Sequence, residues 1–202
     1  MHFSKIINSL SPDQIGKIFP IEIIPYQEVW ESLFLVEKEL ITNILIDFSK
    51  ISIEHIGSTA IQGLFAKPII DILLEYPSLT TATKTIIVAK LNKIDYHNMS
   101  NREQKRQISF GKGYDLHDPD KQKFHLHLRE KISDFQDEIF FRDYLRENAD
   151  VRKKYEELKI DLAKKHKNNR EDYTQAKTEF ITKVTAMAKI YYTKHYAKDA
   201  GF

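Results

Sequence analysis

IEHIGSTAIQGLFAKPIIDILLEY, residues 53–76, is the stretch that decides the fold. A strand-like apolar run ends in Gly57-Ser58, and after twelve intervening residues a second apolar run carries Asp71. A Gly-Ser turn between a strand and a helix offers backbone N–H groups and a hydroxyl to phosphate oxygens. A carboxylate inside an apolar strand is costly to bury unless it binds a cation or several donors. The stretch therefore predicts a site for metal-assisted phosphoryl or nucleotidyl transfer, with a structural, hydrogen-bonded Asp71 as the alternative.

Helices and strands are predicted on both sides of this stretch. Apolar side chains that recur every three or four residues indicate a long amphipathic helix from Pro25 to about Phe48. Strands are expected at 51–56, 68–76, 107–111 and 123–129, and one or two helical turns at 59–65. A helix is expected at 78–94, and further helices at about 134–147, 150–167 and 170–196. A strand that is apolar on both faces, such as 68–76, lies inside a covered sheet.

These elements predict an α/β (α+β) fold in which helices flank a mixed β-sheet. The sheet core is expected at about 50–130 and the helical C-terminal part at about 134–196. Residues 1–20 are predicted to form an N-terminal helical arm, and residues 21–202 a single domain, because 202 residues are few for two independent cores.

Composition narrows the function classes. The chain has no Cys, which excludes a disulfide framework, a thiolate nucleophile and a zinc-thiolate site. No apolar run approaches the roughly 20 residues that span a bilayer, so we expect a soluble, cytoplasmic protein. The net charge of +2 gives no reason to expect nucleic acid as a partner.

A second candidate site lies in KFHLHLR, residues 123–129, where polar and apolar side chains alternate strictly. This alternation puts His125, His127 and Arg129 on one face of the predicted strand. Two imidazoles two residues apart lie roughly 6.6 Å from each other along a strand. That spacing allows both to contact one metal ion or phosphate, and the alternative is a solvent-facing strand that carries two His.

Several motifs together resemble the GrpB family over roughly residues 23–190. They are HIGSTA (55–60), QGL (62–64), AKPIIDI (66–72), FHLHL (124–128), FRDYLREN (141–148), Tyr155-x-x-Leu-Lys159 and Asp172-Tyr173-Thr174-x-Ala-Lys177. The resemblance implies a fold similar to that of the polymerase-β-type nucleotidyltransferases, with the Gly-Ser turn before a helix and a metal-binding acid on the next strand. It implies no particular substrate.

The chain departs from the general nucleotidyltransferase pattern at one position. Gly57-Ser58 and Asp71 match it, but Leu73 stands where a second carboxylate belongs. Two-metal transfer needs ligands that hold two ions about 3.5–4 Å apart. His125 and His127 are the replacements that we expect, and a site of Asp71 with two imidazoles would suit Zn²⁺ or Mn²⁺ better than Mg²⁺.

The leading functional hypothesis is transfer of a nucleoside monophosphate from an NTP to a small-molecule or protein acceptor, with a divalent metal ion (Mg²⁺, Mn²⁺ or Zn²⁺). Gly57 and Ser58 would hold the triphosphate, and Asp71, His125 and His127 would bind the metal or act in catalysis. By resemblance, Lys67, Arg142 and Lys177 would offset phosphate charge. The alternatives are a non-catalytic protein that binds a nucleotide or phosphorylated metabolite, and a metal-dependent phosphoester hydrolase.

Overall fold

The structure is a computed structural model that describes residues 10–99, 107–131 and 137–199. Residues 1–9 of the expected N-terminal arm lie outside this part. The helices are α2 (Pro12–Ile18), α3 (Val29–Ile44), the short 3₁₀ helix η1 (Ser58–Ala60), α4 (Thr81–Asn92), α5 (Asp137–Glu147), α6 (Ala149–Lys165), α7 (Arg170–Ala176) and α8 (Thr178–Asp199). The strands are β1 (Ser52–Ile56), β2 (Ile69–Tyr76), β3 (His97–Asn98), β4 (Gln107–Lys112) and β5 (Lys123–Glu130).

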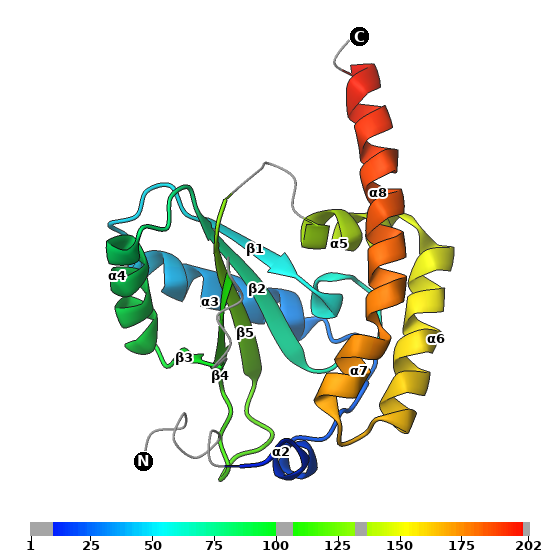
Figure 1. Cartoon of the computed structure of the whole chain (residues 1–202), viewed down its shortest axis with the longest axis horizontal. Coiled ribbons are helices and arrows are strands. Elements are labelled where there is room, and N and C mark those ends of the chain that lie inside the picture. Colours follow the sequence, from blue (N-terminus) through cyan, green and yellow to red (C-terminus); the bar gives the residue numbers. More distant parts are fainter. Residues whose placement is uncertain (1–9, 100–106, 132–136, 200–202) are drawn as a thin grey trace.

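One mixed sheet of five strands carries the fold, in the order β1-β2-β5-β4-β3 (Figure 1). The central pair β2–β5 is parallel, and the other pairs are antiparallel. In this register Asp71 lies opposite His125, and Leu73 lies opposite His127. The predicted α/β (α+β) class and the mixed sheet flanked by helices are therefore confirmed.

The two faces of the sheet differ in chemistry because side chains alternate along each strand. On one face Ile70, Ile72 and Leu74 of β2 and Leu126 and Leu128 of β5 are buried. They join a core to which α3 and α4 also contribute. The opposite face carries Asp71 and the two histidines, so the polar side chains of both central strands share one side.

Helices of the C-terminal part cover that polar face. Their own apolar core includes Phe141 and Leu145 of α5, Tyr155 of α6, and Val184 and Ala188 of α8. In Figure 1, α6, α7 and α8 stand side by side along one edge of the molecule. The predicted helical C-terminal part is thus present, and it leaves room above the sheet for a cavity.

The structure differs from the predicted elements at three places. The helix expected at 170–196 is interrupted at Lys177, whose N–H donates to the carbonyl of Thr174, three residues back, at 3.3 Å. The helix expected within 59–65 shrinks to η1, and Gly63 follows it with φ 77°, a left-handed conformation that does not continue a helix. The short strand β3 was not predicted, because two residues carry too little alternation to detect.

The segment before α3 fastens the loop that precedes β2 to the C-terminal helices. Ile24 and Ala66 form an isolated antiparallel bridge. Three residues earlier, the Ile21 N–H donates to the carbonyl of Lys167, in the α6–α7 connection, at 2.8 Å. Lys67 is thereby held next to α7, although 106 residues separate Lys67 from Tyr173 in the sequence.

Candidate functional site

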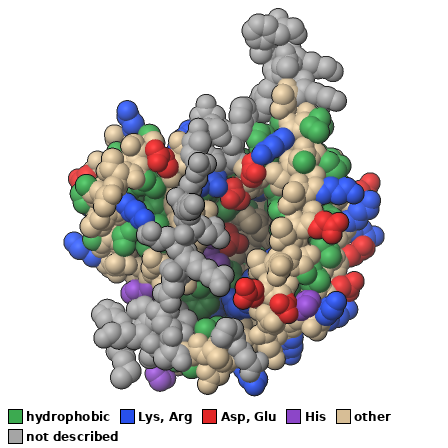
Figure 2. Space-filling view, viewed as in Figure 1, with side chains coloured by type: hydrophobic (Ala, Val, Ile, Leu, Met, Phe, Trp, Pro, Cys, Tyr) green, Lys and Arg blue, Asp and Glu red, His purple; other side chains and the backbone are tan. Residues whose placement is uncertain are grey.

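A cavity of about 740 Å³ opens between the polar face of the sheet, η1 and the helices α6 to α8. Figure 2 shows acidic, basic and histidine side chains gathered in a recess beside these helices. The charged and histidine residues that line it are Lys67, Asp71, His125, His127, Asp137, Glu138, Lys159, Lys177 and Lys189. Gly57 and Ser58 also line it. Among the predicted site residues, the structure brings all but Arg142 together around one space.

At Gly57 the backbone lies so close to Asp71 that there is no room for a side chain. Its φ of 73° and ψ of −171° belong to a region that is essentially open to glycine alone. A Cβ at this position would stand under 3.0 Å from Oδ2 of Asp71 and about 3.0 Å from its Cβ. The Gly-Ser turn therefore lies directly against the carboxylate, as their Cα register, Ile56 opposite Asp71, requires.

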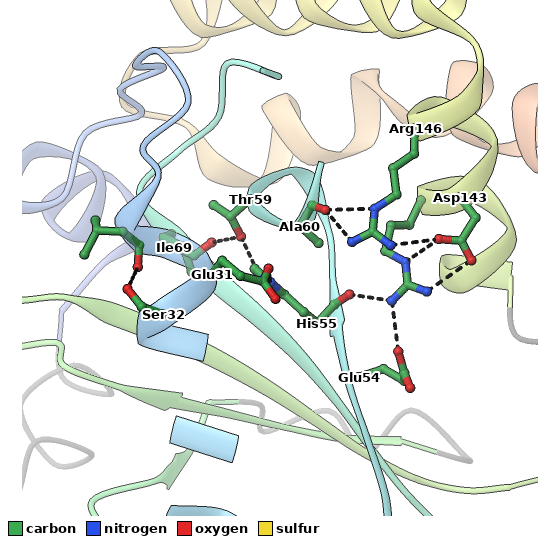
Figure 3. A network of polar contacts seen from close by, with 11 residues as sticks. Glu31, Ser32, Glu54, His55, Thr59, Ala60, Ile69, Asp143 and Arg146 are labelled. Carbon is green, nitrogen blue, oxygen red and sulfur yellow. Dashed lines mark hydrogen bonds and ion pairs between the residues drawn. The ribbon is translucent and has the colours of Figure 1, made fainter. Parts of the chain in front are cut away.

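The turn is fixed from behind by a polar network (Figure 3). The Thr59 hydroxyl donates to the Ile69 carbonyl at 3.2 Å and accepts from His55 Nε2 at 3.1 Å. Arg146 donates to the Ala60 carbonyl at 2.7 and 3.1 Å. Each bond has one end within three residues of Ser58, so the network holds the backbone of the turn in place on both sides of Ser58.

His55 belongs to this network in its neutral form. Burial lowers its pKa to about 4, against the opposing charge of Glu31. Its ring stacks on Phe34 with centroids 4.6 Å apart, and only 3% of the residue is exposed. His55 thus supports the turn structurally and does not line the cavity.

Arg142 also acts behind the turn, which corrects the expectation that it offsets phosphate charge. Its Nη1 donates to the His55 carbonyl at 2.8 Å and to Glu54 Oε2 at 3.0 Å. Its Nε and Nη2 donate to the Asp143 carboxylate at 2.8 and 3.1 Å. Its guanidinium is committed to two carboxylates and a carbonyl, and the residue is not part of the cavity wall.

Replacing Arg142 by leucine is expected to lower the free energy of unfolding by about 2–3 kcal/mol, because the buried His55 carbonyl loses its charged donor. Urea denaturation of the purified protein measures this change. Lys164→Ala, on an exposed part of α6, is the control and is expected to change stability by less than about 0.5 kcal/mol. A loss of polyphosphate binding by Arg142→Leu without any loss of stability would contradict this structural role.

Asp71 is held by His125. Its Oδ1 lies 3.3 Å from His125 Nδ1, and the other ring nitrogen, Nε2, is hydrogen-bonded to the Tyr114 hydroxyl. Burial alone would raise the pKa of Asp71, but the hydrogen bond from His125 and the nearby charges of His125 and Lys67 lower it below its usual value. Asp71 is therefore an ionised carboxylate, and His125 fixes its orientation.

His127 lies one ring further along the same strand, with its centroid 6.4 Å from that of His125. This agrees with the separation expected from the alternating sequence. Its Nδ1 lies 2.9 Å from Gln107 Nε2 and 3.1 Å from Ser109 Oγ. Burial lowers the pKa of His127, which the negative charge of Asp71 only partly opposes.

Three lysines line the cavity together with Asp71. Lys67 and Lys177 both lie over the ring of Tyr173, at 5.4 and 4.3 Å from its centroid. Lys159 lies over Tyr155 at 4.8 Å and donates to the Phe65 carbonyl. Within the described ranges, none of the three has a carboxylate at ion-pair distance. The site therefore holds an excess of positive charge that an anion would neutralise.

The lysines depress one another's pKa values. Burial, with the charges of Lys177 and Arg170, lowers the pKa of Lys67 to about 8. Burial, with the charge of Lys177, lowers the pKa of Lys159 to about 7. A phosphate placed among them would raise these values again, because it favours the charged forms.

The side chains around Asp71 suit a magnesium ion better than the Zn²⁺ or Mn²⁺ ion expected from the sequence. In the part of the chain that is described, no group of three His, Asp or Glu side chains is arranged to hold one ion. Both ring nitrogens of His125 already have protein partners. Asp71 offers a single ionised carboxylate toward the cavity, and Mg²⁺ commonly binds through one or two carboxylates together with substrate phosphates. Asp71 and a bound polyphosphate would therefore suffice for one such ion.

Sequence reasoning placed Gly57, Ser58, Lys67, Asp71, His125, His127 and Lys177 in the site, and the structure gathers them in the cavity wall. The sequence pattern alone assigns no role to Lys159 or Tyr173. Both lie on helices whose periodicity is ordinary, and only their motifs within the family-like pattern single them out. Lys159 is 2% exposed, and the part of the chain that is described holds no carboxylate at ion-pair distance from it; both facts depend on the tertiary fold.

Comparison with known proteins gives consistent matches. Residues 20–187 match the family model described as GrpB protein. The Glutamate-rich protein GrpB of Alkalihalophilus pseudofirmus is 37% identical over 163 residues, which cover 80% of this chain and 92% of that protein. A UPF0157 protein of Pseudomonas aeruginosa is 33% identical over 181 residues, covering 90% of this chain and 72% of that protein. The crystal structure of the conserved protein GrpB from Enterococcus faecalis, 29% identical, superposes with a TM-score of 0.72 over 85% of this chain and 99% of that chain.

No helix in the described ranges is both long and apolar enough to cross a membrane.

Proposed function

The chain belongs to the GrpB family, and from that premise we propose that it transfers a nucleoside monophosphate from an NTP to a small-molecule or protein acceptor. One observation carries the proposal. Three lysines, for which the described residues offer no carboxylate at ion-pair distance, line one cavity with an ionised Asp71 and a Gly-Ser turn. An anion with several phosphate groups and a divalent cation would satisfy both kinds of charge.

Each residue of the cavity then has a stated task. Lys67, Lys159 and Lys177 offset the charge of the phosphate chain, and Ser58 donates to a phosphate oxygen. Asp71 would hold a divalent ion, which supplies charge neutralisation at the phosphates when it is bound. His125 positions the Asp71 carboxylate. The acceptor oxygen or nitrogen attacks the α-phosphorus and gives up its proton to solvent, the bond to the bridging oxygen breaks, and pyrophosphate leaves toward the lysines.

The alternative is binding without transfer, and Leu73 favours it. At 1% exposure this side chain puts hydrocarbon in the place of the second carboxylate, so β2 contributes one acid, Asp71, to the cavity wall. Transfer with one ion then depends on the lysines for the charge of the leaving pyrophosphate.

A panel of labelled NTPs with Mg²⁺, Mn²⁺ or Zn²⁺ separates these readings. Release of pyrophosphate with a labelled product supports transfer. A raised melting temperature without turnover supports the binding protein, because a ligand that binds only the folded state stabilises it. Release of inorganic phosphate without pyrophosphate supports hydrolysis of a phosphoester. No effect of any polyphosphate, with or without metal, would refute the proposed site.

Binding of inorganic tripolyphosphate at pH 8 is expected to take up protons. The pKa values of Lys67 and Lys159, about 8 and 7 in the free protein, rise when an anion binds, so a fraction of both lysines gains a proton. Calorimetry in buffers of different ionisation enthalpy measures this uptake. The affinity should accordingly fall as the pH rises from about 7 to 9.

Lys67→Met is the matched variant, because it keeps the length and bulk of the side chain without its charge. It is expected to weaken tripolyphosphate binding about tenfold and to reduce the proton uptake. Lys164→Met, on exposed α6, is expected to change neither. Equal proton uptake by the wild type and by Lys67→Met would contradict the assignment of this lysine.

A further inference from the structure

Two side chains of β4 determine which nitrogen of His127 faces the cavity. Ser109 lies opposite His127 in the antiparallel β4–β5 pair, and Gln107 precedes Ser109 on the same face. The Gln107 amide nitrogen lies 2.9 Å from His127 Nδ1 and 3.4 Å from Ser109 Oγ. Ser109 Oγ is itself 3.1 Å from the same Nδ1. His127 Nδ1 thus faces the amide nitrogen of Gln107, which can only donate, and the hydroxyl of Ser109, which can donate to it.

This arrangement selects one tautomer. An amide nitrogen donates hydrogen bonds and cannot accept them, so Nδ1 must be the unprotonated nitrogen of the ring. In neutral imidazole the proton then sits on Nε2. Burial disfavours the doubly protonated ring. For Nε2 the structure records no hydrogen bond within the described ranges, and His127 lines the cavity.

We propose that His127 is a neutral hydrogen-bond donor whose Nε2–H binds a phosphate oxygen of the substrate, and that it is neither a metal ligand nor a general base. The tautomer follows from Gln107 and Ser109 alone, whereas the identity of the bound oxygen rests on the proposed function. A ring nitrogen that carries a proton has no lone pair to offer a metal ion or an acceptor hydroxyl.

The position of His127 explains what such a donor does. Its Cα partner across the β2–β5 pair is Leu73, the residue that replaces the second carboxylate. Where a second acid would recruit a second cation to neutralise phosphate, this chain offers an N–H group and an apolar side chain. The donor therefore contacts the phosphate directly, and the substrate class that it selects is a polyphosphate with an unshielded oxygen near His127.

Nuclear magnetic resonance of the ligand-free protein tests the tautomer directly. Two-bond proton–nitrogen correlations of the His127 ring are expected to show Nε2 protonated and Nδ1 bare. Gln107→Glu places a carboxylate next to Nδ1. Because an ionised carboxylate only accepts hydrogen bonds, it favours an Nδ1–H group, and this variant is expected to carry the ring proton on Nδ1. Gln107→Leu serves as the matched variant without any hydrogen-bonding group. A wild-type ring that carries its proton on Nδ1 alone would overturn the inference.

Tripolyphosphate affinity tests the donor's role. His127→Gln keeps an N–H donor in a similar place and is expected to bind within about threefold of the wild type, whereas His127→Leu binds about tenfold more weakly. His127→Glu retains a base but no donor, and it is expected to bind at least as weakly as His127→Leu. Equal affinities of the Gln and Leu variants would refute the contact. Absence of binding by the wild type would refute the proposed function, and the resonance measurement would still decide the tautomer.

Discussion

Gly57→Ala is expected to abolish metal-dependent nucleotide binding while leaving the chain folded. The added methyl group would stand under 3.0 Å from the Asp71 carboxylate, so the turn, the carboxylate or both must move. The φ of 73° adds backbone strain, which costs about 1–3 kcal/mol for a residue other than glycine. The displaced carboxylate also loses its alignment with His125. Thermal shift with an NTP and Mg²⁺ measures the binding, and circular dichroism checks the fold.

Gly63→Ala is the control for this substitution. Gly63 has a similar φ of 77°, but nothing lies within 4 Å of an added Cβ. Strain without collision is expected to lower stability by a similar amount and to leave nucleotide binding intact. If both variants lost binding equally, backbone strain would explain the result, and the contact between Gly57 and Asp71 would not be the cause.

Asp71→Asn is expected to abolish the effect of divalent ions on nucleotide binding and to lower any transfer rate by at least about a hundredfold. Asparagine has nearly the same shape, but it removes the negative charge that would hold the ion. In the absence of metal the expected change has the opposite sign. Tripolyphosphate should bind more tightly to the variant, because a negative charge has been removed from a cavity that contains Lys67, Lys159 and Lys177.

The pair of opposite changes distinguishes loss of a metal ligand from loss of structure. Calorimetry with tripolyphosphate, with and without Mg²⁺, records both. Asp161→Asn, on an exposed part of α6, is the control and is expected to change neither affinity. A metal-dependent shift that survives in Asp71→Asn would refute the metal-binding role of Asp71, and weaker binding without metal would indicate a disturbed cavity.

The sheet and its polar face could be predicted because polar and apolar residues alternate along the strands in the sequence. Leu126 between His125 and His127 puts both imidazoles on one face, and the apolar run around Asp71 places it on a central strand. Each inference needs only the period of two that a strand imposes. The resemblance to the family added the order of the elements.

The cation cluster could not be predicted from local pattern, because its members come from the loop before β2, from α6 and from the α7–α8 junction. Whether a lysine is solvated or buried depends on what packs over it, and sequence periodicity does not report this. Arg142 is a second case in which the local sequence does not show the partners of a charged side chain. Its motif pointed to phosphate, but the tertiary fold supplies Glu54, Asp143 and the His55 carbonyl as its partners. The tautomer of His127 likewise depends on a neighbouring strand 18 and 20 residues away.

The carboxylate of the site, Asp71, comes more than a hundred residues before its last lysine, Lys177, in the sequence. The ribosome therefore makes the acidic part of the site well before the basic part is complete. Asp71 and His125 can pair as soon as β5 joins the sheet, whereas Lys177 reaches the cavity only when α7 and α8 pack against it. Chains grow from the N-terminus and fold as segments leave the ribosome. A nascent chain with a finished sheet would therefore carry the carboxylate but not the complete cation cluster. The growing polypeptide should bind polyphosphates only weakly until its last helices are in place, and ligand capture would then report that folding is complete.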